Sequence, residues 1–256
     1  MISIKFQTLA VQKDGNTVDE YQDASTTNTI KYDGALEIYA AVADGATDSY
    51  FAGIWARMLT RAFSKGAIET IDDLQRQLGC LSERWHNVVT RKPLNWYDEE
   101  GVEKGAFATL CGVKISLHGD NANSGVFKAT AIGDSCLIQV RKEKLINMFP
   151  INCSSEFGNN PWLISSNLKS NQRLLDHYKL CQGDWQSGDC FIIMTDAIAQ
   201  WFLHEFENEL RPWDVLFQLS IAVNCHQAFI DWVSEMRNSK KMKNDDTTVI
   251  IIKMGC

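Results

Sequence analysis

The alternation of apolar and polar positions predicts a chain that mixes strands with helices. Ile2–Phe6 alternates apolar and polar residues, which is typical of a strand with one buried face. The largely apolar segment Leu36–Ala43 predicts a buried strand, and Phe191–Met194 predicts a shorter one. The β-branched run Thr248–Ile252 predicts a further strand near the end of the chain.

The middle of the chain predicts a cluster of strands, and helical periodicity occurs on both sides of it. The strand segments are Phe107–Leu117, Val126–Ile132, Leu137–Arg141 and Lys144–Phe149. Apolar residues recur at helical spacing in Trp55–Phe63, Ile71–Val88, Ile198–Phe202, Trp213–Val223 and Cys225–Met236. Because strands and helices are intermixed without strict alternation, this order favours a layered α+β domain over a doubly wound sheet.

Three stretches have no regular pattern. Lys13–Asn28 is polar, Arg91–Gly105 predicts a charged loop, and Ile151–Ser187 predicts a long irregular excursion. Excursions of this length are more often functional than accidental. Asp48 predicts the N-cap of the first helix, and the basic run Lys240–Lys243 predicts a solvated turn before the last strand.

Composition and charge exclude several classes of protein. Lys and Arg number 25 and Asp and Glu number 32, so the net charge of −7 argues against a protein that binds nucleic acid or an anionic membrane. No apolar run approaches the roughly 18 residues of a membrane span, and the first residues turn polar too early for a signal peptide. Eight scattered cysteines without a CxxC pair indicate a reducing compartment. We therefore expect a cytoplasmic protein.

Aspartates stand where the expected buried strands begin or end. Asp44, Asp134 and Asp196 each follow such a strand, and Asp245 and Asp246 precede the last one. An ionised carboxylate beside a core strand is costly unless it is paired or binds a metal ion, and no Lys or Arg lies within three residues of the first three aspartates. Carboxylates that converge at the rim of a sheet would bind Mg²⁺ or Mn²⁺. The alternative is that each aspartate only caps a helix or begins a turn.

The aspartates belong to five short motifs that occur in a fixed order. They are Tyr21-Gln22-Asp23-Ala24, Ala43-Asp44-Gly45, Gly133-Asp134-Ser135, Met194-Thr195-Asp196-Ala197 and Asp245-Asp246-Thr247-Thr248. This ordered set resembles the PPM family of metal-dependent Ser/Thr protein phosphatases, and its first and fourth motifs resemble the divergent bacterial branch. The resemblance implies a four-layer α-β-β-α sandwich, in which two antiparallel sheets are flanked by helices. It also implies a single domain over residues 1–256, with a flap near residues 151–187.

The resemblance also implies a set of metal ligands. Asp44 resembles the aspartate that bridges two catalytic ions, and the carbonyl oxygen of Gly45 resembles a ligand of one ion. Asp196 and Asp245 resemble the carboxylate ligands of the other ion. Asp134 resembles a residue of a third, weaker site. The implied cofactors are therefore two ions of Mn²⁺ or Mg²⁺, with a third as an open alternative.

Further positions either match the family or depart from it. Asp23 resembles the acid that holds metal-bound water, so Asp23 and Asp44 are the expected catalytic residues. Many members carry Glu at the position of Gln22, and many carry a phosphate-binding Arg a few residues earlier. No Arg occurs there, so the phosphate-binding residue is open, with Lys13 as the nearest upstream candidate. Ala46-Thr47 excludes a histidine general acid directly after the second motif.

The implied activity is the removal of phosphate from phosphoserine and phosphothreonine in proteins. A hydroxide that bridges the two ions would attack the phosphorus atom, which agrees with the absence of any nucleophile motif. The expected partners are a phosphorylated protein and a cognate Ser/Thr kinase system, without nucleic acid or membrane. Two alternatives stay open: an inactive or weakly active relative that binds phosphoproteins as a regulator, and a phosphatase of small molecules.

Overall fold

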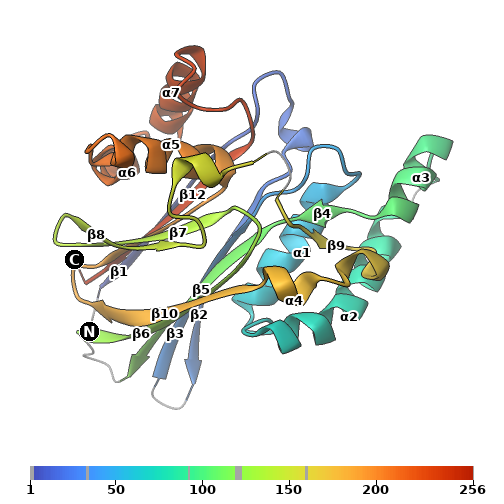
Figure 1. Cartoon of the computed structure of the whole chain (residues 1–256), viewed down its shortest axis with the longest axis horizontal. Helices are drawn as coiled ribbons and strands as arrows, with labels where there is room; N and C mark the ends of the chain where they lie inside the picture. The colour runs from blue at the N-terminus through green and yellow to red at the C-terminus, as the bar shows by residue number, and fades with distance from the viewer. Residues whose placement is uncertain (1–2, 33–34, 92, 119–122, 159–160, 256) are drawn as a thin grey trace.

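Two five-stranded antiparallel sheets pack face to face in this computed structural model, which describes residues 3–32, 35–91, 93–118, 123–158 and 161–255 (Figure 1). The strands of the first sheet are, in spatial order, β1 (Ile4–Val11), β12 (Thr247–Met254), β11 (Cys190–Met194), β7 (Cys136–Arg141) and β8 (Lys144–Phe149). Those of the second sheet are β10 (Lys179–Gln186), β6 (Ser124–Ile132), β5 (Leu110–His118), β3 (Ala35–Ala43) and β2 (Ala24–Tyr32).

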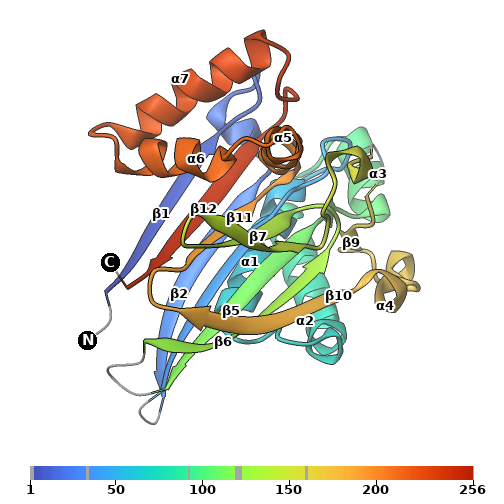
Figure 2. The ribbon, with the colours of Figure 1, turned by 60° about the vertical axis from the view of Figure 1, so that its left-hand side comes forward.

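Helices cover the outer face of each sheet and complete four layers. The second sheet is covered by α1 (Ala52–Ser64) and α2 (Ile71–Val89). The first sheet is covered by α5 (Asp196–Glu207), α6 (Pro212–Ile221) and α7 (Cys225–Asn238), as Figure 2 shows. The expected α+β architecture, an α-β-β-α sandwich, is therefore confirmed.

The central strand β3 is apolar from Ile38 to Ala43 because both of its faces are buried there. In β3, Ile38, Ala40 and Val42 face the opposite sheet, whereas Tyr39 and Ala41 face the helices. All five of these side chains are at most 2% exposed. In an antiparallel sheet with one solvated face such a strand would alternate with polar residues instead.

Shorter elements join these layers. They are η1 (Val18–Glu20), α3 (Trp96–Lys104), β4 (Phe107–Ala108), η2 (Ser154–Glu156), β9 (Ile164–Ser165), η3 (Leu168–Asn171) and α4 (Leu174–His177). The two short strands β4 and β9 pair with each other. No helix in the described ranges is long and apolar enough to cross a bilayer.

The structure adds regular elements in three segments where the sequence predicted none. The charged loop expected over Arg91–Gly105 contains α3, and the polar segment Lys13–Asn28 runs into β2. The segment expected to be irregular up to Ser187 ends in β10, which pairs with β6. Both β2 and β10 are edge strands that are largely open to solvent, so they lack the apolar run by which buried strands are recognised.

The first helix does not begin at the expected cap. It starts at Ala52, and its N-cap position is Phe51, which has a φ of 58°. Asp48 lies in the preceding turn, is exposed and lines a cleft at the end of the sandwich. The N-cap prediction for Asp48 was therefore wrong.

Candidate metal centre

Strand ends from both sheets meet at one end of the sandwich and carry four aspartates. Asp44 follows β3 and Asp134 follows β6 in the second sheet, whereas Asp196 follows β11 and Asp245 precedes β12 in the first. All four side chains line one cleft of about 500 Å³. The arrangement brings together carboxylates that lie as much as two hundred residues apart in the sequence.

Asp44 is the aspartate most affected by its neighbours. Its backbone is held by Thr109, whose hydroxyl accepts from the Asp44 N–H at 2.8 Å and whose N–H donates to the Asp44 carbonyl at 2.8 Å. Burial raises the pKa of the Asp44 carboxyl well above its usual range, and the charges of Asp23, Asp196 and Asp134 raise it further. A divalent cation in the cleft would offset the repulsion between these carboxylate charges.

Two further carboxyls of the cleft show the same behaviour. Burial and then the charge of Asp196 raise the pKa of Asp134 to about 7. The Oδ1 atom of Asp134 is buried and accepts no hydrogen bond from any described residue. Burial also raises the pKa of Asp196, against the opposing effect of Lys243. An unpaired buried carboxylate oxygen is costly, so the Oδ1 atom of Asp134 is suited to a cationic ligand in the cleft.

Lys243 lies between two of the expected ligands. Its Nζ is 3.1 Å from Asp196 Oδ2 and 2.7 Å from Asp245 Oδ2. Partial burial acts to lower the pKa of Lys243, but the charges of Asp196 and Asp245 raise it above its usual value. Lys243 therefore places a single positive charge where the carboxylates attract a cation. The expected solvated turn over Lys240–Lys243 is exposed at its three lysines, and Lys243 additionally pairs with the two aspartates.

Asp23 lies behind the cleft rather than in its lining. Only 1% of the residue is exposed, and its Oδ2 accepts hydrogen bonds from Thr195 at 2.9 Å and from Thr248 at 2.7 Å. Its Oδ1 has no partner among the described residues. Burial raises the pKa of Asp23 to about 8, and the hydrogen bond from Thr248 only partly offsets this effect. From this position Asp23 acts on Asp44 through its charge.

Gly45 occupies a position that excludes a side chain. A Cβ atom there would lie 2.7 Å from the carbonyl oxygen of Gln22. With its amide nitrogen turned towards the second motif, Gln22 donates to the carbonyl oxygens of Gly45 and Ala46, both at 3.1 Å. Lys13 lines the cleft with the aspartates, as its candidacy for phosphate binding requires.

Asp246 and Arg237 support the site, and sequence reasoning did not identify either role. The Asp246 carboxylate accepts hydrogen bonds from the backbone N–H groups of Lys13 at 2.8 Å and Gln22 at 2.6 Å. It therefore anchors the N-terminal segment beside the cleft. Arg237 is 8% exposed and donates to the Asp245 carbonyl and to the Asp14 carboxylate. These partners are far apart in sequence, so no local spacing indicates them.

One signal for Arg237 is present in the sequence. Phe229, Val233 and Arg237 follow one another at intervals of four residues and are the buried residues of α7. An arginine on the apolar stripe of a helix indicates a buried charge, which requires hydrogen-bonding partners elsewhere in the protein.

The donor chemistry of the cleft fits a hard divalent cation. The four aspartates at the strand ends offer carboxylate oxygens, which Mg²⁺ and Mn²⁺ prefer. One of these oxygens, Oδ1 of Asp134, is buried without a partner among the described residues. As the side chains stand, no three Asp, Glu, His or Cys residues in the described part of the chain converge closely enough to enclose an ion. The Lys243 ammonium group would therefore have to move away from Asp196 and Asp245 before an ion could bind to both of them.

Several solved structures share this fold at low sequence identity. The catalytic domain of the Ser/Thr protein phosphatase PstP, solved with two manganese ions, is 13% identical over 100% of both chains, with a TM-score of 0.54. The photosystem II phosphatase PBCP is 16% identical over 98% of both chains, with a TM-score of 0.53. PppA from Pseudomonas aeruginosa is 13% identical over 99% of both chains, with a TM-score of 0.52. Identities this low show the common fold.

Family membership rests on the sequence. No curated protein matches the chain. Residues 19–243, which include Asp23, Asp44, Asp134 and Asp196, match the family described as protein phosphatase 2C. The match covers most of the 256 residues, contains the first four of the five motifs and agrees with their PPM resemblance. This chain belongs to the protein phosphatase 2C family.

Proposed function

We propose that this protein is a Mn²⁺- or Mg²⁺-dependent phosphomonoester hydrolase that acts on phosphoserine and phosphothreonine in proteins. The observation that carries the proposal is the meeting of four aspartates from both sheets in one cleft, with the pKa values of Asp44, Asp134 and Asp196 raised. Family membership and the two manganese ions of PstP support the choice of metal and reaction.

Each group of the cleft would have a distinct role in metal binding. Asp44, Asp196 and Asp245, with the Gly45 carbonyl oxygen, would hold two ions, and Asp134 would hold a third, weaker one. When bound, such ions lower the pKa of water and offset charge on phosphoryl oxygens. Thr109 holds the Asp44 backbone, and Arg237 holds the carbonyl of Asp245.

Among the described residues, two lysines line the cleft, and both are candidates for attracting the phosphoryl group. Lys13 is the one that lies upstream of the first motif, and Lys243 is the one that contacts the carboxylates. No histidine lines the cleft among the described residues, so a histidine general acid has no support. Within this proposal the substrate is a phosphorylated protein, the opposing enzyme is a Ser/Thr kinase, and the compartment is the cytoplasm.

Hydrolysis of p-nitrophenyl phosphate and of phosphoserine peptides with Mn²⁺ tests the proposal. Asp44→Ala and Asp196→Ala should each lower kcat/KM by about 10³-fold, because each removes a group that positions charge opposite the transition state. Asp48→Asn is the matched control, because Asp48 lines the same cleft but is exposed. It should keep most of the activity.

The opposite results would contradict the proposal. Equal activity in the wild type and both alanine variants would mean that the aspartates are not catalytic. An inactive wild type at saturating Mn²⁺ would mean that the protein is not a phosphatase of this kind. Far faster turnover of nucleotides than of phosphopeptides would contradict the protein substrate and favour a small-molecule phosphatase.

A second candidate is a regulator that binds phosphoproteins without hydrolysing them. It is favoured by the position of Lys243 between Asp196 and Asp245 and by the absence of an Arg before Asp23. Calorimetry distinguishes the two candidates. The enzyme requires Mn²⁺ to bind more tightly than millimolar, whereas the regulator is favoured if no such binding is measured.

A further inference from the structure

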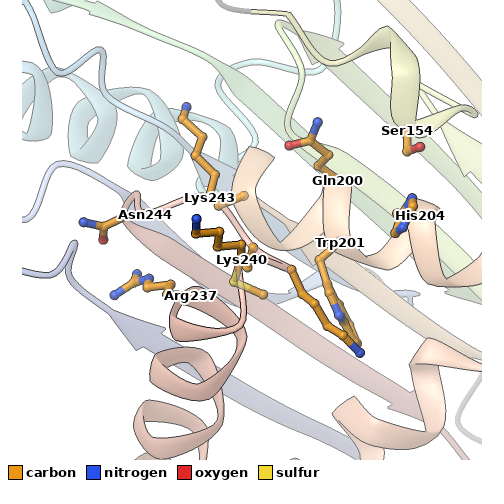
Figure 3. Close-up of a pocket in the computed structure, with 11 residues that line it drawn as sticks. Ser154, Gln200, Trp201, His204, Arg237, Lys240, Lys243 and Asn244 are labelled. Atoms are coloured by element: carbon orange, nitrogen blue, oxygen red, sulfur yellow. The ribbon is translucent and has the colours of Figure 1, made fainter.

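A second hollow lies beside the cleft, on the other side of the first turn of α5. Its volume is about 490 Å³, and it is enclosed by α5 and by residues 239–246, the connection between α7 and β12. Figure 3 shows Gln200, Trp201 and His204 on α5, and Lys240, Lys243 and Asn244 on the connection. We call this hollow the basic pocket.

The residues that line the basic pocket carry positive charge only. They include Arg237, Lys240, Lys241 and Lys243 and no Asp or Glu from the described residues. Arg237 and Lys243 are committed to partners, since Arg237 pairs with Asp14 and Lys243 with the cleft aspartates. Lys240 and Lys241 are exposed, and their amino groups make no ion pair or hydrogen bond with the described chain. Two unpaired charges therefore face the pocket in a protein whose net charge is −7.

The connection that carries these lysines is held in a defined shape. Lys240 has a left-handed φ of 58°, and its N–H donates to the Arg237 carbonyl at 2.9 Å. The N–H of Lys241 donates to the Met236 carbonyl at 2.9 Å, and Met242 is 6% exposed. Because the backbone is hydrogen-bonded and Met242 is buried, the connection presents Lys240 and Lys241 to solvent beside the pocket.

The basic pocket adjoins the candidate metal centre. Lys243 lines both hollows, and the adjacent residues Asp196 and Ala197 line the cleft and the basic pocket respectively. A peptide with its phosphorylated residue in the cleft would thus have its neighbouring residues at the basic pocket. We propose that the basic pocket binds acidic side chains that flank the phosphorylated residue of the substrate protein, an inference that rests on the proposed function.

Other anionic partners fit the basic pocket less well. Trp201 is its large aromatic residue, but it is 4% exposed and packs edge to face against Trp232 with ring centroids 4.7 Å apart. It therefore offers no free face on which a nucleobase could stack, which single-stranded nucleic acids require. Carboxylate groups need only the ammonium groups that the pocket presents.

Binding of fluorescent peptides tests this inference without using catalysis. Anisotropy is measured with a glutamate-rich peptide and with its glutamine counterpart, in 50 mM and 300 mM salt, on the protein with and without Mn²⁺. The wild type should bind the acidic peptide more tightly, and the preference should shrink at the higher salt because exposed charges are screened. Lys240→Ala with Lys241→Ala should weaken binding of the acidic peptide about fivefold, the effect of losing two exposed charge contacts.

A matched control exists in the turn between β7 and β8. Lys142 and Lys144 are exposed, and Lys142 has a left-handed φ of 47°, much like Lys240. Lys142→Ala with Lys144→Ala removes the same net charge and should leave peptide binding unchanged. With phosphopeptides that carry acidic flanks, the pocket variant should raise KM about fivefold at constant kcat and leave hydrolysis of p-nitrophenyl phosphate unchanged.

Three results would overturn the inference: no preference for the acidic peptide, an equal loss in the control variant, or tighter binding of a single-stranded oligonucleotide of equal charge. Failure of the proposed function is a different observation. In that case the peptide preference and its loss in the pocket variant would persist, while p-nitrophenyl phosphate would not be hydrolysed with Mn²⁺.

Discussion

The cleft and the basic pocket are neighbours with opposite charge and opposite exposure. Asp44, Asp134 and Asp196 have raised pKa values because burial disfavours their ionised forms, whereas Lys240 and Lys241 lie in water. Buried like charges destabilise the folded protein until a ligand arrives, and exposed charges cost little. The difference teaches that burial, more than the number of charges, indicates which hollow is suited to a tightly bound ion.

The largest effect expected from this difference is a dependence of stability on pH. The folded pKa values of Asp134 and Asp23, about 7 and about 8, lie above the roughly 3.9 of an unfolded aspartate. Between these values the unfolded chain has released protons that the folded chain keeps, so the free energy of unfolding falls as pH rises. For Asp134 alone the loss from pH 5 to pH 8 is roughly 3 kcal/mol.

Urea unfolding with a chelator at pH 5 and pH 8 measures this effect. Asp134→Asn should reduce the slope, and Asp48→Asn, which changes an exposed aspartate of the same cleft, should keep it. Added Mn²⁺ should restore stability at pH 8 more than at pH 5. A metal-free protein that gains stability as pH rises from 5 to 8 would contradict our account of the cleft.

The next effect concerns the residue that supports both hollows. Arg237 lines the basic pocket and also donates to Asp14, Gln12 and the Asp245 carbonyl. Arg237→Met should destabilise the protein by about 2 kcal/mol, because it removes a buried charge and leaves its hydrogen-bond acceptors unpaired.

Thermal and urea unfolding of Arg237→Met and Arg211→Met provide the comparison. Arg211 also forms ion pairs, with Glu143 and Asp214, but it is exposed, so its loss should cost less than about 1 kcal/mol. Equal destabilisation of the two variants would show that Arg237 does not support the site.

The smallest effect concerns Lys243, which lines both hollows. Its ammonium group competes with a metal ion for Asp196 and Asp245. Lys243→Ala should therefore tighten Mn²⁺ binding about tenfold, equivalent to roughly 1.4 kcal/mol. Calorimetry with Lys241→Ala as control tests this, because Lys241 lines only the basic pocket. Weaker Mn²⁺ binding in Lys243→Ala would instead make Lys243 part of the metal site.

The sequence predicted the inner parts of the fold better than its edges. Buried strands such as β3 and β11 have continuous apolar runs, and α2 has a regular apolar stripe. By contrast, the edge strands β2 and β10 leave much of their surface in water, so their residues are mostly polar. For α3, the sequence Trp96–Lys104 is charged and weakly periodic, which resembles a loop.

The candidate site divides in the same way. Its aspartates were found because each stands just before or just after an apolar strand, which is a local signal. The support from Lys243, Asp246 and Arg237 was not found, because each of them contacts at least one residue far away in the chain, up to 233 residues in the case of the Asp246–Lys13 contact. Contacts of this kind depend on the tertiary fold, which no local pattern reports.

The position of β12 affects when the candidate site can assemble during synthesis of the chain. This strand lies between β1 and β11 inside the first sheet, and Asp245 directly precedes it. A nascent chain on the ribosome therefore exposes Asp44, Asp134 and Asp196 to the cell long before Asp245 is translated. Until then the first sheet lacks an inner strand and the cleft lacks one of its four aspartates, so the candidate site can form only after the segment that contains Asp245 and β12 has been translated.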